Sequence, residues 1–214
     1  MGEASLGVVQ LESGNWQLRA RSGIEGSAGT RMEAELAPNG HGGARLLHQR
    51  SESHDENGIS LGVMAIDHRR GVATCNPPPG SRDEPVEIEL PRRDRVVNIP
   101  LNLLFEPLVR GERSEVDFQL LLCRVRGGRI VDAHATVANR RGADADQVIE
   151  VRYELDFGPI LSRLAAPFLP KLSLYFSEHS PGTWVGHRMP LFSKGPTVLV
   201  VRSGFDPAML GVGE

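Results

Sequence analysis

The sequence predicts an all-β fold built from antiparallel strands. Apolar residues alternate with polar residues along much of the chain, and turn-forming residues separate these stretches at short intervals. Glycine and proline are frequent, with 24 and 15 copies in 214 residues. An alternation of period two places one face of a strand in the core and the other face in water. Short turns join strands that are neighbours in an antiparallel sheet. We therefore expect a long antiparallel meander.

The alternation is clearest in the segments 16–21, 30–36, 116–120 and 149–157. Their apolar side chains are expected to share the covered face of the sheet, whereas the intervening Arg152 and Glu154 are expected to face water. The residues predicted to form this core are Trp16, Leu18, Met32, Leu36, Phe118, Leu120, Val151, Tyr153, Leu155 and Phe157. Further strands are predicted over 4–12, 43–54, 59–67, 70–75, 86–90, 128–138, 171–177, 183–189 and 196–202.

Short segments rich in Gly, Asn and Asp separate these strands. Examples are Ser13-Gly14-Asn15, Glu56-Asn57-Gly58 and His68-Arg69-Arg70-Gly71, each of which is compatible with a hairpin turn. A twisted sheet of about a dozen strands does not remain flat. We therefore predict a strongly curved meander, either a half-barrel or a barrel.

Three segments interrupt the strand pattern. Residues 96–109 and 160–169 are apolar but contain Pro100, Pro107 and Pro167, which prevent long helices. We interpret them as one or two short helical plugs against the sheet. The proline-rich stretch near 76–85 favours an extended loop. Because the strands on both sides have the same character, we predict a single β domain over residues 1–214 with a crossing loop at this place.

Composition excludes several classes of protein. The chain has 24 Lys and Arg residues against 27 Asp and Glu residues, a formal net charge of −3, so it lacks the basic excess of a nucleic-acid binder. No apolar run reaches the length of about 20 residues that crosses a bilayer. The N-terminal residues lack the basic and apolar regions of a secretory signal. The expected compartment is the cytoplasm, or the envelope if the native chain was trimmed.

Cys75 and Cys123 are the only cysteines, and both follow apolar, strand-like residues. We interpret them as buried free thiols. A disulfide between them is the alternative, which stays open because the sequence does not give their separation in space.

The sequence contains none of the motifs GxSxG, HExxH, GxxxxGK or GxGxxG. We therefore predict no catalytic residue, no cofactor and no metal site. His48 and His54 share a strand face but lie about 20 Å apart, too far for one metal ion. Asp67-His68, Glu178-His179 and the row Asp132, His134 and Thr136 pair carboxylates with imidazoles. The last row is the strongest candidate for proton transfer, although it also fits the exposed face of a strand.

Several short motifs resemble a bacterial family of envelope proteins of unknown function. They are Gly2-Glu3-Ala4-Ser5-Leu6, Trp16-Gln17-Leu18-Arg19, Ile66 to Gly71, and Leu90-Pro91 before the apolar segment 101–105. That family in turn resembles LolA, LolB and VioE, which are curved half-barrels around an apolar concavity. The resemblance covers about residues 2–140 and implies a periplasmic or envelope location, with a strand and a signal peptide preceding Gly2.

Three functions fit these observations. The first is a carrier or sensor that holds a lipid or another apolar ligand in the concave face of the sheet. The second is a cofactor-independent enzyme of the VioE type, and the third is a structural or assembly protein that binds a partner through a sheet face. For the first function we predict the ligand-binding residues Leu103, Leu104, Phe105, Phe118, Tyr153 and Phe168.

Overall fold

The computed structural model describes residues 2–24, 29–38, 44–91, 96–98, 101–123, 127–141, 147–158, 172–178, 183–190 and 197–210. Its strands are β1 (Gly2–Gln10), β2 (Trp16–Ile24), β3 (Gly29–Pro38), β4 (Ala44–His54), β5 (Ser60–Asp67), β6 (Val72–Asn76), β7 (Val86–Glu89), β8 (Glu115–Leu122), β9 (Arg129–Arg141), β10 (Val148–Asp156), β11 (Leu172–Ser177), β12 (Thr183–Pro190) and β13 (Thr197–Val201). Two four-residue helices, α1 (Leu101–Leu104) and α2 (Glu106–Val109), precede β8, and a 3₁₀ turn covers Pro207–Leu210. The prediction of an antiparallel all-β fold is confirmed.

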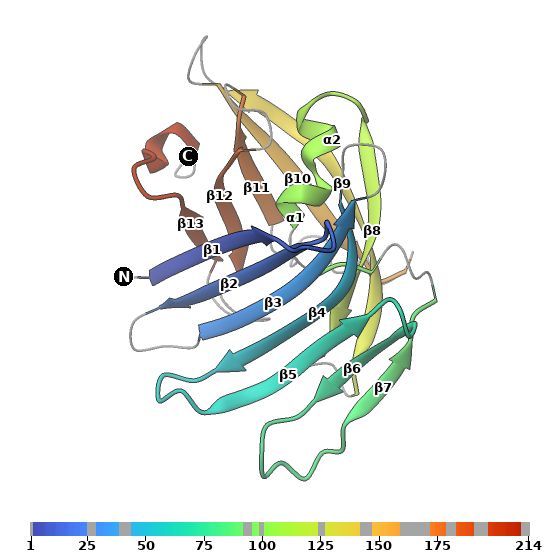
Figure 1. The fold of residues 1–214 in the computed structure, drawn as a ribbon. Coiled ribbons are helices and arrows are strands. Elements are labelled where there is room, and N and C mark those ends of the chain that lie inside the picture. The colour runs from blue at the N-terminus through green and yellow to red at the C-terminus, as the bar shows by residue number, and fades with distance from the viewer. Residues whose placement is uncertain are drawn as a thin grey trace. The chain divides into compact units, whose positions relative to one another are not determined.

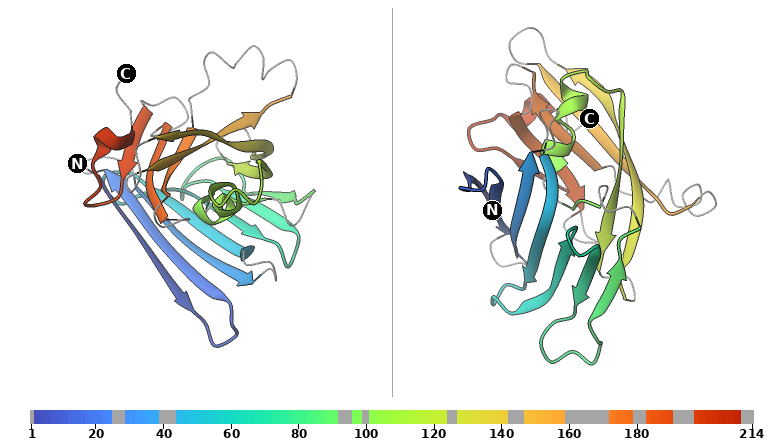
Figure 2. Two further views of the ribbon diagram at one scale, coloured as in Figure 1. Left: turned by 90° about the horizontal axis from the view of Figure 1, so that it is seen from above. Right: turned by 45° about the vertical axis from the view of Figure 1, so that its right-hand side comes forward.

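The strands form two sheets in which each strand pairs with its neighbour in the chain (Figure 1). The first sheet contains β1 to β7 in order, and the second contains β8 to β13 in order. Figure 2 shows β1 to β7 side by side from two further directions. The meander is divided between β7 and β8, where α1 and α2 lie and where Pro91 and Pro107 cannot donate to a strand ladder.

The chain forms two compact units. The first contains Met1–Ile99 and Gln119–Ile130, and the second contains Pro100–Phe118 and Val131–Glu214. The proline-rich segment 77–85 joins β6 to β7, which pair with each other within the first unit. That residues 1–214 form a single β domain stays a prediction.

The first unit has one apolar and one charged sheet face. Leu18, Ala34, Gln49 and Ile66 lie in register on the covered face, which is apolar except for Gln49, and each is at most 2% exposed. The opposite face carries cross-strand ion pairs, such as Arg19 with Glu33 at 3.3 Å. These exposed pairs contribute little to stability. The burial of the apolar row therefore sets the register of this sheet.

The predicted core residues are largely buried. Leu18, Met32, Leu36, Phe118, Leu120, Val151 and Tyr153 are buried, whereas Trp16, Leu155 and Phe157 are half-buried. Glu154 is exposed as predicted. The side chain of Arg152 is 39% exposed and also pairs with the buried Glu150 at 3.2 Å. Its charge therefore offsets that of a buried carboxylate.

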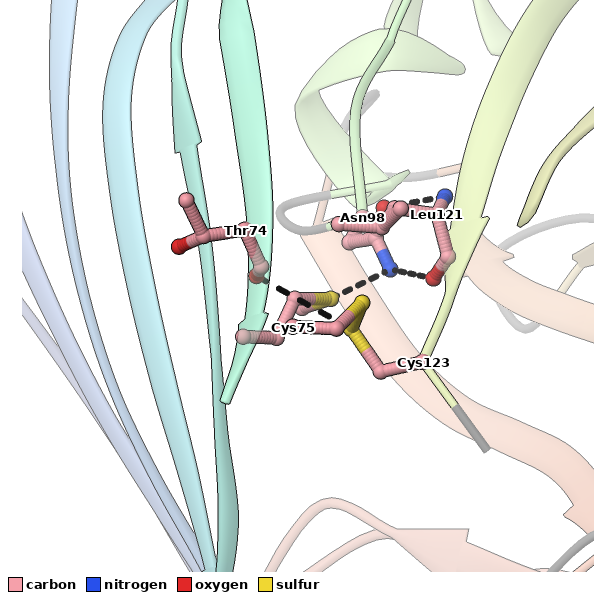
Figure 3. Close-up of a disulfide and its surroundings, with 6 residues drawn as sticks. Thr74, Cys75, Asn98, Leu121 and Cys123 are labelled. Atoms are coloured by element: carbon pink, nitrogen blue, oxygen red, sulfur yellow. Dashed lines mark hydrogen bonds between the residues drawn. A yellow bond between two sulfur atoms is a disulfide. The ribbon is translucent and has the colours of Figure 1, made fainter. Parts of the chain in front are cut away.

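The cysteines form a disulfide, so the interpretation as free thiols is wrong. Cys75 lies on β6 and Cys123 directly follows β8, and their Cα atoms are 5.3 Å apart (Figure 3). The side chain of Asn98 links the end of β8 to β5, because its amide also lies 3.2 Å from Sδ of Met64, the register partner of Cys75. Its amide donates to the carbonyl of Leu121 at 2.8 Å, and its oxygen accepts from the Leu121 amide at 2.9 Å. The folded chain therefore supplies the separation that the sequence could not.

No helix in the described part of the chain is long and apolar enough to cross a bilayer.

Candidate functional site

Three aromatic side chains meet in the interior of the second unit. Phe105 comes from the junction of α1 and α2, Phe118 from β8 and Tyr153 from β10. The ring centroids of Phe105 and Phe118 are 5.4 Å apart in an edge-on arrangement, and those of Phe105 and Tyr153 are 5.8 Å apart. Such geometries add to the stabilisation that burial provides. We call these three residues together with His187 the aromatic cluster.

Two very short helices place Phe105 in the cluster. Pro107 lies in the first turn of α2, where its missing N–H is not needed, and α2 packs against β10. Phe105 and Leu108 are fully buried. The backbone closes only single helical turns here, for example from the Phe105 amide to the Leu101 carbonyl at 3.0 Å. Side-chain burial, rather than helix length, therefore holds this segment in place.

Tyr153 and His187 form the polar edge of the cluster. The Tyr153 hydroxyl lies 3.1 Å from Nε2 of His187, and the two ring centroids are 6.1 Å apart. His187 is on β12, on the same face of the sheet as its partner Leu174 on β11. A buried tyrosine hydroxyl needs such a partner.

Burial shifts the pKa values of both side chains away from neutral pH. Desolvation lowers the pKa of His187 to about 4 and raises the pKa of the Tyr153 hydroxyl. Both side chains are therefore neutral at pH 7, and the hydrogen bond between the Tyr153 hydroxyl and Nε2 of His187 joins two uncharged groups. A general acid or base works best with a pKa near the operating pH, so this pair is suited to hydrogen bonding rather than to proton transfer.

The structure brings together three of the six predicted ligand-binding residues: Phe105, Phe118 and Tyr153. Leu103 and Leu104 are half-buried on α1, directly before Phe105. Phe168 lies outside the described residues, as does the predicted plug at 160–169. The role of all six residues in ligand binding stays a prediction.

The carboxylate and histidine pairs lie elsewhere. His134 is exposed on β9, and its Nδ1 lies 2.8 Å from Asp117 on β8. Its Nε2 also lies 3.8 Å from Glu115 on β8, and the pairing of His134 with Asp132 stays a prediction. Nε2 of His68 lies 2.7 Å from the Val96 carbonyl oxygen. The carboxylate of Asp55 accepts from the amides of Asn57 and Ile59, as expected for a hairpin tip.

Sequence reasoning missed His187. The residue lies on β12 opposite the buried Leu174, on the face of the sheet that Tyr153 shares. The available signal was a polar residue at a position where the alternation requires an apolar one. A single histidine in such a pattern is a weak signal, because its partner Tyr153 is 34 residues away.

A hollow of 460 Å³ lies on the first unit, over β1, β2 and β3. Its walls include Ser5, Arg19, Arg21, Arg31 and Glu33. Most of these residues belong to the charged face of the sheet. This hollow is therefore not the apolar concavity that the sequence predicted.

No family model matches the chain, and no curated protein matches it. Among solved structures, the chain is similar to a beta-barrel-like protein of the domain of unknown function DUF1849 from Brucella abortus. The TM-score is 0.41, with 11% identity over 88% of this chain and 81% of that chain. It is also similar to a DUF1089 family protein from Pseudomonas aeruginosa, with a TM-score of 0.38 and 15% identity over 86% of this chain and 87% of that chain. Because both TM-scores are low, we assign no function from them.

Proposed function

We propose that this protein is a carrier or sensor for a lipid or another apolar ligand, and that the aromatic cluster is its binding site. The observation that carries the proposal is the cover over the cluster. Phe105 is inserted by two helices of four residues each, which are too short to be stable on their own, so a ligand that supplies the apolar contacts of the buried Phe105 can take its place. The ligand then occupies the place of Phe105 against Phe118.

The Tyr153 and His187 pair gives the site one polar anchor. Its hydroxyl and its imidazole are neutral at pH 7, so they suit a ligand with a hydroxyl, carbonyl or ester group at one end. Their neutrality also favours binding over the alternative of an enzyme of the VioE type. The resemblance to LolA and LolB remains part of this proposal. So does the expectation, which comes from that resemblance, that the sheet curves around an apolar concavity.

The proposed compartment is the periplasm or envelope. The Cys75 and Cys123 disulfide supports it, because structural disulfides persist in oxidising compartments and are rare in the cytosol. Expression with a periplasmic export signal should give protein without free thiols. If reduced protein retained in the cytosol bound the apolar ligand fully, that result would argue against this location.

The ligand proposal is tested by titrating palmitate and an uncharged aromatic probe while following tryptophan fluorescence. Trp184 on β12 lies in the same unit as the cluster, so we expect a saturable response at micromolar ligand. Leu104→Asp and Phe105→Asp should weaken it at least tenfold. Ile59→Asp, at a position that is 61% exposed, is the matched control and should bind normally. No saturable response in the folded protein would refute the proposal.

A further inference from the structure

The geometry points to a homodimer in which β1 of one copy pairs with β1 of a second copy, so that the first sheet continues from one chain into the other. β1 is a terminal strand of this sheet, and among the described strands it pairs only with β2 (Figure 1). Its outer edge therefore carries backbone groups that none of these strands uses. This inference does not depend on the proposed function, because β1 belongs to the first unit and the aromatic cluster to the second.

The hairpin between β1 and β2 shows which residues of β1 present these backbone groups. The Leu11 amide donates to the Asn15 carbonyl at 2.8 Å, so Leu11 bonds across the hairpin. Hydrogen-bonded and non-hydrogen-bonded pairs alternate along an antiparallel ladder, and β1 pairs with β2 without a register shift. The odd-numbered residues of β1 therefore bond to β2. The residues whose N–H and C=O groups face the open edge are Gly2, Ala4, Leu6, Val8 and Gln10.

β1 lacks the features that keep the edges of sheets from pairing. Edge strands are commonly short, or carry charges, prolines or bulges. β1 has nine residues, no proline, no bulge in its pairing with β2, and one charged residue, Glu3. By contrast, β7 at the other end of the same sheet has four residues, and Glu87 and Glu89 are two of them. The first sheet is therefore protected at β7 and open at β1.

The side chains of β1 leave apolar surface in water. Leu6 and Val8 lie opposite Ala20 and Leu18, so they continue the covered face of the sheet up to its edge. Leu18 is fully buried, whereas Leu6 is 52% exposed and Val8 is 54% exposed. A strand added beside β1 removes part of this apolar surface from water, which favours association.

The sequence of β1 makes a second copy a suitable partner. Two identical antiparallel strands pair about a two-fold axis, and Leu6 is the middle residue of β1. With the axis at this position, Leu6 lies opposite Leu6 of the partner subunit, and Val8 lies opposite Ala4 of the partner subunit. Residues that face the open edge then meet residues that do the same, which gives about ten backbone hydrogen bonds. A typical protein interface contains about ten.

Charge is compatible with this register. Glu3, the one charged residue of β1, lies opposite Val9 of the partner subunit, so the two copies of Glu3 are far apart. Like charges directly opposite each other would destabilise the pair. Because one strand from each copy buries less area than a permanent interface does, the dimer should dissociate at micromolar concentration.

The first test is analytical ultracentrifugation of the full chain from low micromolar to near-millimolar concentration. We expect a reversible equilibrium between monomer and dimer. Leu6→Lys places two like charges opposite each other at the axis and should weaken dimerisation at least tenfold. Ile59→Lys makes the same charge change at a residue that is 61% exposed outside β1, and it should dimerise as the wild type does. A monomer at every concentration, or an equal loss in Ile59→Lys, would overturn the inference.

The second test locates the axis with single cysteines. The Cα atoms of a hydrogen-bonded pair are about 5.5 Å apart, which is within the range of a disulfide. Cys75 and Cys123 already bond to each other, so an added thiol reacts with its copy in a second chain. Leu6→Cys should therefore form a covalent dimer under mild oxidation.

Val8→Cys is the matched control, because Val8 is as exposed as Leu6 and lies on the same face. In the proposed register the two copies of residue 8 are four residues apart along the strands, about 14 Å, and should not be linked. Circular dichroism of both variants checks that they are folded. Cross-linking of neither folded variant, or of both to the same extent, would overturn the inference.

Discussion

Breaking the Cys75 and Cys123 disulfide should lower the free energy of unfolding by about 4 kcal/mol. The two cysteines are 48 residues apart in the sequence, so the bond closes a long loop in the unfolded chain. The chain-entropy model for a loop of that length gives about 4 kcal/mol at 25 °C. Since whole domains are stable by about 5–15 kcal/mol, this is a large fraction of the total.

The assay is urea denaturation of three samples: the oxidised protein, the reduced protein and the double variant Cys75→Ser, Cys123→Ser. The reduced protein and the double variant should unfold at similar, lower urea concentrations, and reductant should not change the double variant. A thiol titration in denaturant without reductant should detect no free thiol. Two titrating thiols, or equal unfolding midpoints for oxidised and reduced protein, would refute the reasoning.

Four further predictions concern the folded state and use the same denaturation assay. Phe118→Ala should cost about 3–5 kcal/mol because this ring is 2% exposed, whereas Glu154→Ala should cost under about 0.5 kcal/mol; equal losses would mean that the strand register is wrong. Arg152→Ala should cost about 1–3 kcal/mol because it removes a partner of the buried Glu150, and a neutral result would contradict that pairing. Gly128→Ala should destabilise the first unit, since Gly128 has a φ of +84° and a Cβ there would lie 2.7 Å from Sγ of Cys75; wild-type stability would contradict this packing. Because burial lowers the pKa of His187 to about 4, stability should be complete above pH 6.5 and fall by up to about 3 kcal/mol as the pH drops to 4. His187→Gln should lose this part of the pH dependence, and an unchanged slope would show that another group titrates.

The pairing of Arg152 with Glu150 shows where strand patterns stop being informative. Arg152 alternates correctly with Val151 and Tyr153, and alternation alone marks it as an exposed residue. Its partner Glu150 pairs with Tyr175 and accepts a hydrogen bond from Ser173, both on β11, a strand that begins more than twenty residues further along the chain. Charge burial of this kind depends on which strands become neighbours.

The same limit applies to the aromatic cluster. The alternation placed Phe118 and Tyr153 on a covered face, and the prolines correctly indicated that residues 96–109 contain only short helices. The partner His187 did not follow from the sequence, because one histidine among apolar residues has many structural explanations.

The sequence by itself determined the strands, their antiparallel order and the hairpin connections between neighbours. These features are local, since alternation and turn residues act over two to ten residues. Only the tertiary structure decided that Cys75 meets Cys123, that Tyr153 meets His187, and that the meander divides into two sheets. These three features depend on segments that are distant along the chain. The distance between such segments in the folded protein is set by packing of the fold rather than by any local pattern.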